Sequence, residues 1–144
     1  MNTESFESLS GPVAALFERA DSKGIDSLTT SERVVFVVWS AVGQIENGGF
    51  DQFFYNSSGD FAAEAGPALR AIGATGKAAV IERALQIFPG GIAPRDRNQR
   101  IQMLDEITAE KGDEVFDPLE QAFFAIPEDI NSLLAQYFES QTLT

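Results

Sequence analysis

The chain has 144 residues, 44% of them hydrophobic, which suits one globular domain with a core of its own. It carries 22 acidic and 10 basic residues, for a net charge of −12, and it contains no histidine and no cysteine. This composition excludes disulfides, Ser-His-Asp triads, cysteine nucleophiles and metal sites with histidine or cysteine ligands. The acidic balance also argues against direct binding to nucleic acid or to an anionic membrane.

Capping residues, prolines and glycines divide the chain into helical segments with no long linker between them. Pro12, Pro118 and Pro127 stand where a proline in the first turn of a helix is tolerated, and Asp117 is placed to cap the helix after it. No segment shows the period-two alternation of a strand between hairpin turns. We therefore predict an all-α fold, a single-domain multi-helix bundle over residues 1–144. About seven helices are expected, near residues 12–22, 30–46, 60–72, 75–88, 95–111, 118–125 and 127–140.

The segment near residues 30–46 is predicted to be a buried central helix. Thr29 and Glu32 have the spacing of a capping box, in which each side chain accepts a hydrogen bond from the other residue's backbone N–H. The run that follows is apolar almost all round, which is typical of a helix enclosed by others. Gly48 and Gly49 then end this helix, and one of them is expected to have a positive φ. The predicted core contains Val38, Trp39, Val42 and Phe53.

No targeting or membrane-spanning segment is expected. The chain starts without a basic or an apolar stretch, and its longest purely apolar run is Val34–Trp39. A helix that spans a membrane needs about 20 such residues. We therefore expect a cytoplasmic protein of bacterial type that does not contact a membrane.

Charge is distributed unevenly along the chain. Residues 1–64 carry 10 acids and 3 bases, residues 65–104 carry 2 acids and 6 bases, and residues 105–144 carry 10 acids and 1 base. The helix predicted near 95–111 has Arg95, Arg97 and Arg100 at its N-terminal end, where the helix dipole disfavours cations. Either these arginines pair with groups elsewhere in the fold or in a partner, or solvent screening makes the unfavourable term negligible.

One segment, residues 47–59, reads N-G-G-F-x-Q-F-F-x-N-x-S-G. It resembles the signature of a bacterial DNA-mimic protein family, most of whose members are a domain of unknown function. With its surroundings, the resemblance covers roughly residues 29–138. It implies an all-α fold; the mimic member of the family is acidic and dimeric, and it occupies the DNA-binding surface of a repressor-type transcription factor. The fixed positions here are Asn47, Gly48, Gly49, Phe50, Gln52, Phe53, Phe54, Asn56, Ser58 and Gly59.

This signature is interpreted as mainly structural. The two glycines reverse the chain, and the three phenylalanines have the i, i+3, i+4 spacing that anchors one face of a short helix. The polar members can hydrogen-bond backbone groups at the turns. A functional alternative is a small polar pocket made by Asn47, Gln52 and Asn56.

The function predicted from these observations is that of an acidic, non-catalytic protein-binding domain. Its expected partner is a basic protein, and mimicry of DNA toward a DNA-binding regulator is the form that the resemblance implies. No cofactor, no metal and no direct nucleic acid are expected, and a homodimer is left open. The alternative without a binding role is a solvated or salt-adapted acidic surface. The candidate binding face consists of Glu46, Asp51, Asp60, Glu64, Asp105, Glu106, Glu110, Asp113, Glu114, Asp117 and Glu120.

Two other functions remain open at this point. An immunity or antitoxin-like protein would use the same acidic surface to neutralise a toxin. A magnesium-dependent all-α nucleotide hydrolase would use two E-x-x-D pairs, Glu110 with Asp113 and Glu114 with Asp117. The expected helix break at Gly112 separates these pairs, and no lysine cluster stands ready for phosphates. We therefore expect no enzyme activity.

Overall fold

The computed structural model describes the backbone of residues 3–142 and the side chains of residues 9–141. Within this range the protein is all-α, as predicted, with seven α-helices, three short 3-10 helices and no strand. The 3-10 helices are η1 (Ile25–Ser27), η2 (Ser57–Phe61) and η3 (Pro89–Gly91). The α-helices are α1 (Thr3–Lys23), α2 (Thr30–Tyr55), α3 (Ala62–Ala71), α4 (Thr75–Leu85), α5 (Arg97–Lys111), α6 (Asp117–Ala125) and α7 (Ile130–Thr142).

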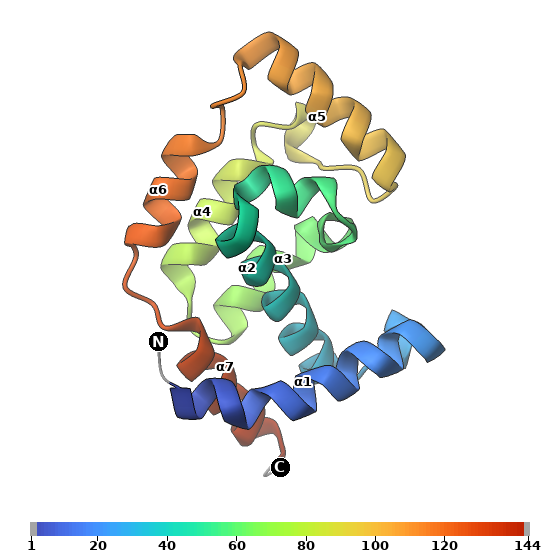
Figure 1. The fold of residues 1–144 in the computed structure, drawn as a ribbon, viewed down its shortest axis with the longest axis vertical. Coiled ribbons are helices and arrows are strands. Elements are labelled where there is room, and N and C mark those ends of the chain that lie inside the picture. The colour runs from blue at the N-terminus through green and yellow to red at the C-terminus, as the bar shows by residue number, and fades with distance from the viewer. Residues whose placement is uncertain (1–2, 143–144) are drawn as a thin grey trace.

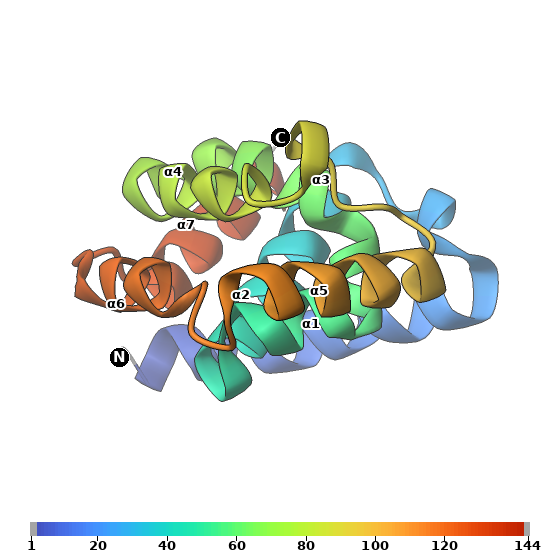
Figure 2. The same cartoon turned by 90° about the horizontal axis from the view of Figure 1, so that it is seen from above.

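Helix α2 runs through the middle of the molecule and contacts most of the other helices (Figure 1). Helix α5 lies across its C-terminal end, α1 and α7 lie toward its N-terminal end, and α6 follows one flank. Seen from above, α3 and α4 lie on one side of α2 and α1 on the other (Figure 2). The predicted central position of this helix is therefore confirmed.

The local signals that predict α2 are present in the structure. The Glu32 N–H donates to Thr29 Oγ1 at 3.2 Å and the Thr29 N–H donates to Glu32 Oε1 at 2.8 Å, which completes the capping box. Val38, Val42 and Phe53 lie in the core as predicted. Trp39 does not: it is partly exposed and packs against the edge of the core. A helix that is apolar all round still leaves one side at the surface when its neighbours do not enclose it completely.

Three expectations about helix starts are wrong. Helix α1 begins at Thr3, so Pro12 lies inside it rather than in its first turn. Phe116, not Asp117, is the N-cap of α6, and Asp117 is the first helical residue. Helix α7 begins at Ile130, three residues after Pro127. Phe116 is held in place by burial rather than by a capping bond, and the segment after Pro127 stays non-helical where Glu128 bonds to α4.

Candidate functional site

The signature segment closes the C-terminal end of α2. The last carbonyl groups of a helix have no partner within the helix and must find one elsewhere. The Asn56 N–H donates to Gln52 O at 3.0 Å, and Ser58 Oγ donates to Phe53 O at 3.0 Å. The Ser58 side chain and the Asn56 backbone N–H thus satisfy carbonyl groups at this turn.

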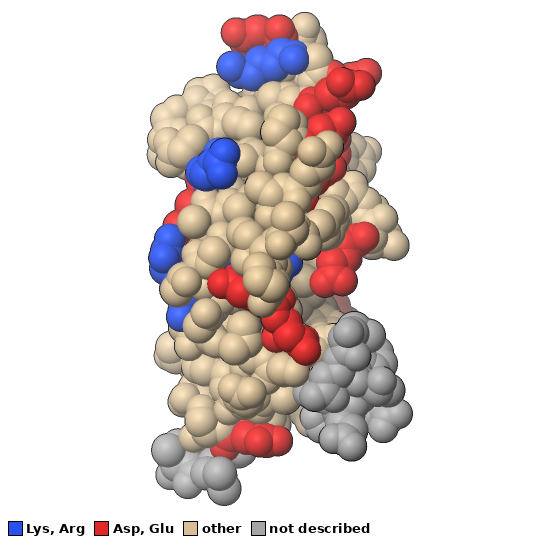
Figure 3. All heavy atoms as spheres, turned by 90° about the vertical axis from the view of Figure 1, so that its left-hand side faces the viewer, with Lys and Arg blue, Asp and Glu red and all other residues tan. Residues whose placement is uncertain are grey.

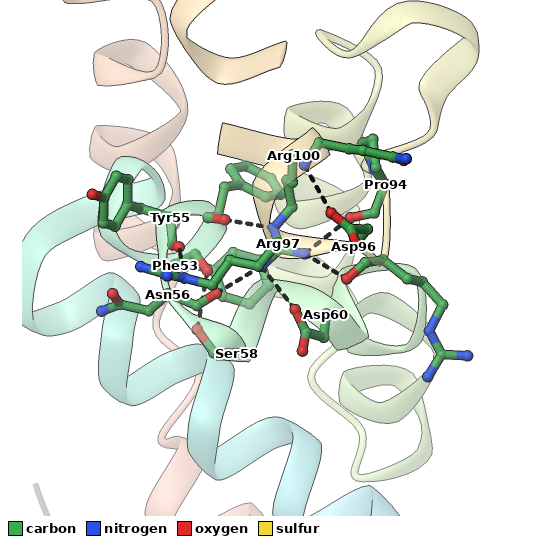
Figure 4. A network of polar contacts seen from close by, with 12 residues as sticks. Phe53, Tyr55, Asn56, Ser58, Asp60, Pro94, Asp96, Arg97 and Arg100 are labelled. Atoms are coloured by element: carbon green, nitrogen blue, oxygen red, sulfur yellow. Dashed lines mark hydrogen bonds and ion pairs between the residues drawn. The ribbon is translucent and has the colours of Figure 1, made fainter. Parts of the chain in front are cut away.

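Two arginines of α5 complete this helix end (Figure 4). Arg100 Nε donates to Phe54 O at 2.5 Å and Arg100 Nη2 donates to Asn56 O at 2.8 Å, while Arg97 Nε donates to Tyr55 O at 2.9 Å. The carbonyl end of a helix dipole is negative and favours cations. Arg97 and Arg100 are therefore explained by tertiary contacts with the end of α2, whereas Arg95 lies over the Phe61 ring, 5.8 Å from its centre.

Arg100 is fully buried, with an exposed fraction of 0%. Its Nη1 donates to Pro94 O and Arg95 O, and its Nη2 lies 2.9 Å from Asp60 Oδ1 in an ion pair. A Cβ on Gly59 would lie 2.6 Å from Arg100 Nε, so the last glycine of the signature makes room for the guanidinium. A buried charge is tolerated here because its donors are met by carbonyls and a carboxylate.

The middle of the signature forms the break in α2. Gly48 has a φ of −150° and Gly49 a φ of 78°, so the predicted positive φ falls on Gly49. The next residue, Phe50, donates its N–H to Glu120 Oε1 of α6 at 2.9 Å. A Cβ on Gly49 would lie 2.2 Å from that same oxygen. The three phenylalanines that follow are fully buried: Phe50, Phe53 and Phe54.

The predicted pocket of three amides is formed only in part: Asn47 and Asn56 line one hollow together with Gln44, and Gln52 is not among its lining residues. Gln52 Nε2 and Asn56 Nδ2 both donate to Gln44 Oε1, each at 2.8 Å, whereas Asn47 is exposed one turn away. The sequence gives no sign of the role of Gln44, because this residue lies before residues 47–59 and is separated from its partners by 8 and 12 residues. These amides hold the two parts of the broken helix together.

The predicted acidic face divides into two groups. Three of its members already have partners within the protein. For Asp60 and Glu64, which pair with arginines, the prediction of a place on the binding face is wrong, whereas Glu120 pairs with no cation and still contributes its charge. Asp60 pairs with Arg100, Glu64 forms a two-pronged pair with Arg33 at 2.7 and 2.9 Å, and Glu120 holds the backbone at the break of α2. Glu46 is exposed but lies apart, in a hollow with Lys77 and the loop between α6 and α7.

Asp51 brings the two acidic thirds of the chain together. Partial burial raises the pKa of its carboxyl group, and the negative charges of Glu120, Asp117 and Asp113 raise that pKa further. These four residues, the carboxylate cluster, come from α2, from α6 and from the turn before α6. No ion pair to a cation is formed by any of them within the described side chains.

The other members of the predicted face extend this acidic region. Asp105, Glu106 and Glu110 are exposed along α5, and Glu114 is exposed in the turn that follows. In Figure 3, carboxylates follow one edge of the face that carries α6, and the Lys and Arg side chains visible there lie mainly toward the opposite edge. The exposed surface near α5 and α6 is therefore dominated by negative charge.

The basic middle third of the chain is largely used within the fold. Lys77 is buried, and its Nζ donates to Phe123 O near the end of α6 at 2.7 Å and lies 4.2 Å from the centre of the Phe123 ring. Burial lowers the pKa of Lys77, against the opposing effect of Glu46 and Glu128. Arg70 pairs with Glu82 at 2.5 Å. Lys77 is thus used inside the fold, and Arg70 pairs with a carboxylate at the surface, away from the carboxylate cluster.

The described residues contain no group of three or more acidic side chains placed to hold a metal ion. Gly112, with a φ of 95°, ends α5 between Glu110 and Asp113, so the two E-x-x-D pairs do not share one helix. None of the helices in the described range combines the length and the apolar character needed to cross a bilayer.

A family model described as DMP19-like protein matches residues 26–141. No curated protein and no solved structure matches the chain. The match corrects the resemblance drawn from residues 47–59. The family match covers residues 26–141 rather than roughly 29–138. It does not single out the N-G-G-F-x-Q-F-F-x-N-x-S-G segment, so that segment is not shown to be the signature of the family.

Proposed function

The chain belongs to the DMP19-like protein family, and on this premise we propose that it is an acidic, non-catalytic protein-binding domain that mimics DNA. The proposed partner is a protein whose DNA-binding surface is rich in lysine and arginine. The exposed carboxylates near α5 and α6 take the place of phosphates on that surface. Direct binding to nucleic acid forms no part of this role, because the exposed region near α5 and α6 would repel phosphates.

The carboxylate cluster is the observation that supports this proposal. The pKa of Asp51 is raised first by burial and then by the negative charges of Glu120, Asp117 and Asp113, so these charges disfavour the ionised Asp51 in the free protein. Cations on a partner would relieve that repulsion. Asp117 and Glu120 are three residues apart on α6, which places their Cβ atoms about 5–6 Å apart. DNA carries one phosphate on each strand for about every 3.4 Å of helix axis, so a row of carboxylates can present charge at a similar density.

Capture from a lysate of the native host, followed by two separate elutions, tests the mimicry. Protein bound at about 50 mM salt should be released by higher salt, because exposed charges are screened within about 10 Å at 0.1 M. It should also be released by a short DNA duplex at constant salt, since duplex and mimic compete for one surface. Partners that elute with salt but never with duplex would contradict DNA mimicry.

Two matched double variants then locate the surface. Asp51→Asn with Asp117→Asn removes two charges from the cluster, and Glu18→Gln with Asp26→Asn removes two exposed charges near the end of α1. The cluster variant should associate with the captured partner about tenfold more slowly at low salt, because rim charges act mainly on association rates. The control should change the rate less than about twofold. Equal rates for the two variants would contradict the assigned surface.

A further inference from the structure

A long hollow follows one side of α2, apart from the carboxylate cluster. It consists of three adjoining parts with volumes of about 910, 180 and 440 Å³. The first two parts share Trp39 and Gly43, and the last two share Glu46, Ile130 and Asn131. The hollow thus extends from the region of α1 and η2, along α2, to α7 and the loop before it.

The groove combines apolar and polar side chains, and most of its charged groups are acidic. Phe17, Phe36 and Trp39 line it from α1 and α2 and are all partly exposed. Five carboxylates also line it, and the one cation among its lining residues is Lys77, whose Nζ is already bound to a backbone carbonyl. The five carboxylates belong to Asp21, Glu46, Asp60, Glu128 and Asp129. Asp60, Glu128 and Asp129 already have partners within the chain, which leaves Asp21 and Glu46 for a bound molecule.

Gly43 lies inside α2, and no contact within this chain requires a glycine at that position. Glycine is one of the poorest helix formers, and a Cβ at this position would meet no atom within 4 Å. Other glycines within helices are explained by their neighbours. A Cβ on Gly66 would lie 2.7 Å from Glu82 Oε2, and Gly11 precedes Pro12, where a Cβ is disfavoured in a helix.

We propose that this groove is the docking site for a basic amphipathic helix of a partner protein, which crosses α2 at Gly43. The absent side chain lets a partner's backbone approach closely at the point where two parts of the groove meet. The apolar side of that helix covers Phe17 and Trp39, and its lysines or arginines reach Asp21 and Glu46. This is recognition of an amphipathic helix by a groove that offers both apolar and acidic contacts.

The charge of the groove decides between occupants. A second copy of this chain offers few free cations to these carboxylates, since its Lys77, Arg97 and Arg100 are held by backbone carbonyls. A basic helix is attracted to the same carboxylates. The proposed function supports only the basic character of the partner; the groove and Gly43 carry the rest of the inference.

Binding can be followed through Trp39, the only tryptophan of the chain. The probe is a synthetic peptide of leucine and lysine, about 18 residues long, patterned as an amphipathic helix of about five turns. A peptide of the same composition with scrambled order is the control. The patterned peptide should shift the Trp39 emission to shorter wavelength, and this shift should saturate with peptide concentration. The scrambled peptide should need about a tenfold higher concentration for the same shift.

Matched variants test the groove itself. Gly43→Leu fills the junction, and Ala79→Leu adds the same side chain to an exposed position of α4 outside the groove. Gly43→Leu should weaken binding of the patterned peptide about tenfold or more, with Ala79→Leu within about twofold of the parent. Gly43→Ala should raise the melting temperature while it weakens binding, because alanine favours the helix but narrows the approach.

Peptide binding that is unchanged in Gly43→Leu, or that leaves the Trp39 emission unmoved, would overturn the inference. So would self-association that Gly43→Leu abolishes in the absence of peptide, since the occupant would then be a second copy. The double variant Asp51→Asn with Asp117→Asn separates this inference from the proposed function. It should impair capture of the DNA-competed partner and leave peptide binding within about twofold. A tenfold loss of peptide binding in that variant would place the site at the carboxylate cluster instead.

Discussion

The part of α2 that follows the break at Gly49 has opposite charge environments at its two ends. At its C-terminal end, two arginines donate to three carbonyls, and the buried Arg100 also meets Asp60. At its beginning, Asp51 faces three other carboxylates with no cation paired to any of them among the described side chains. The arginines at the C-terminal end satisfy backbone carbonyls of the fold. The carboxylates at the beginning repel one another, and a cationic partner or protonation would relieve that repulsion.

This difference shows where the net charge of −12 resides. The chain has cations enough to neutralise part of its outer surface, but Lys77, Arg97 and Arg100 are held by backbone carbonyls at helix ends. The acids near α5 and α6 remain uncompensated as a result. A strongly negative exposed surface therefore follows from how the fold uses its bases, as well as from their small number.

The largest expected effect comes from removing Arg100. Arg100→Met should lower the free energy of unfolding by about 3–5 kcal/mol, because Asp60 and the carbonyls at the end of α2 lose a buried partner. Urea denaturation followed by circular dichroism measures this loss. Arg97→Met is the matched control: Arg97 is exposed and makes one such bond, so it should cost about 1 kcal/mol or less.

Arg100→Lys sharpens the same test. A lysine keeps the charge but cannot donate to carbonyls of α2 and to Pro94 in one planar arrangement. It should recover less than half of the stability lost in Arg100→Met. Full recovery by lysine would show that charge alone, rather than the geometry of the guanidinium, closes the end of α2.

A smaller effect is expected at the break itself, where two adjacent glycines should differ. Gly49→Val should destabilise the protein by about 2 kcal/mol, because φ is positive and the new Cβ would displace Glu120 from the Phe50 N–H. Gly48→Val should cost less, about 1 kcal/mol, since its φ is negative, although the new Cβ would crowd Gln52 from its amide to its Cβ. Thermal melts of both variants decide. Equal losses would mean that general helix disruption, and not the turn at Gly49, sets the cost.

Local signals made much of α2 predictable from the sequence. The capping box, the positive φ near Gly49 and the burial of Val38 and Phe53 all depend on residues within a few positions of one another. Such patterns report the conformation of the backbone directly. The extent of α1 was not predictable in the same way, because Pro12 inside a helix resembles the start of one.

The candidate site was less predictable because its contacts join distant parts of the chain. Asp60 and Glu64 look like any exposed carboxylate in a sequence, and only the fold reveals Arg100 and Arg33 as their partners. The unfavourable arginines at the start of α5 did carry a signal, since their placement called for a partner. That signal could not say that the partner was the end of α2 rather than another protein.

The smallest expected effect tests the other half of the comparison, the repulsion around Asp51. Its pKa is raised in the folded protein, first by partial burial and then by Glu120, Asp117 and Asp113. Protonation of Asp51 therefore favours the folded state, so its contribution to stability is greatest below the unfolded pKa of about 3.9 and is lost as pH rises through the folded pKa. At pH 7 Asp51→Asn should stabilise the protein by about 0.3–0.5 kcal/mol, a value kept small by solvent screening.

The sign of the pH dependence makes this prediction testable despite its size. The stability difference between Asp51→Asn and the parent should shrink as pH falls from 7 toward 4, because the parent gains its proton and loses the repulsion. Other carboxylates contribute equally to the pH dependence of both proteins, so their contributions cancel in the difference. Glu32, whose pKa is lowered by hydrogen bonds from Arg19 and Thr29, is one of them. Asp26→Asn, which removes an exposed carboxylate 3.4 Å from Arg33, should show no stabilisation at pH 7. Urea melts at several pH values give both differences. A difference for Asp51→Asn that grows toward pH 4, or one matched by Asp26→Asn, would mean that the cluster carries no repulsion for a partner to relieve.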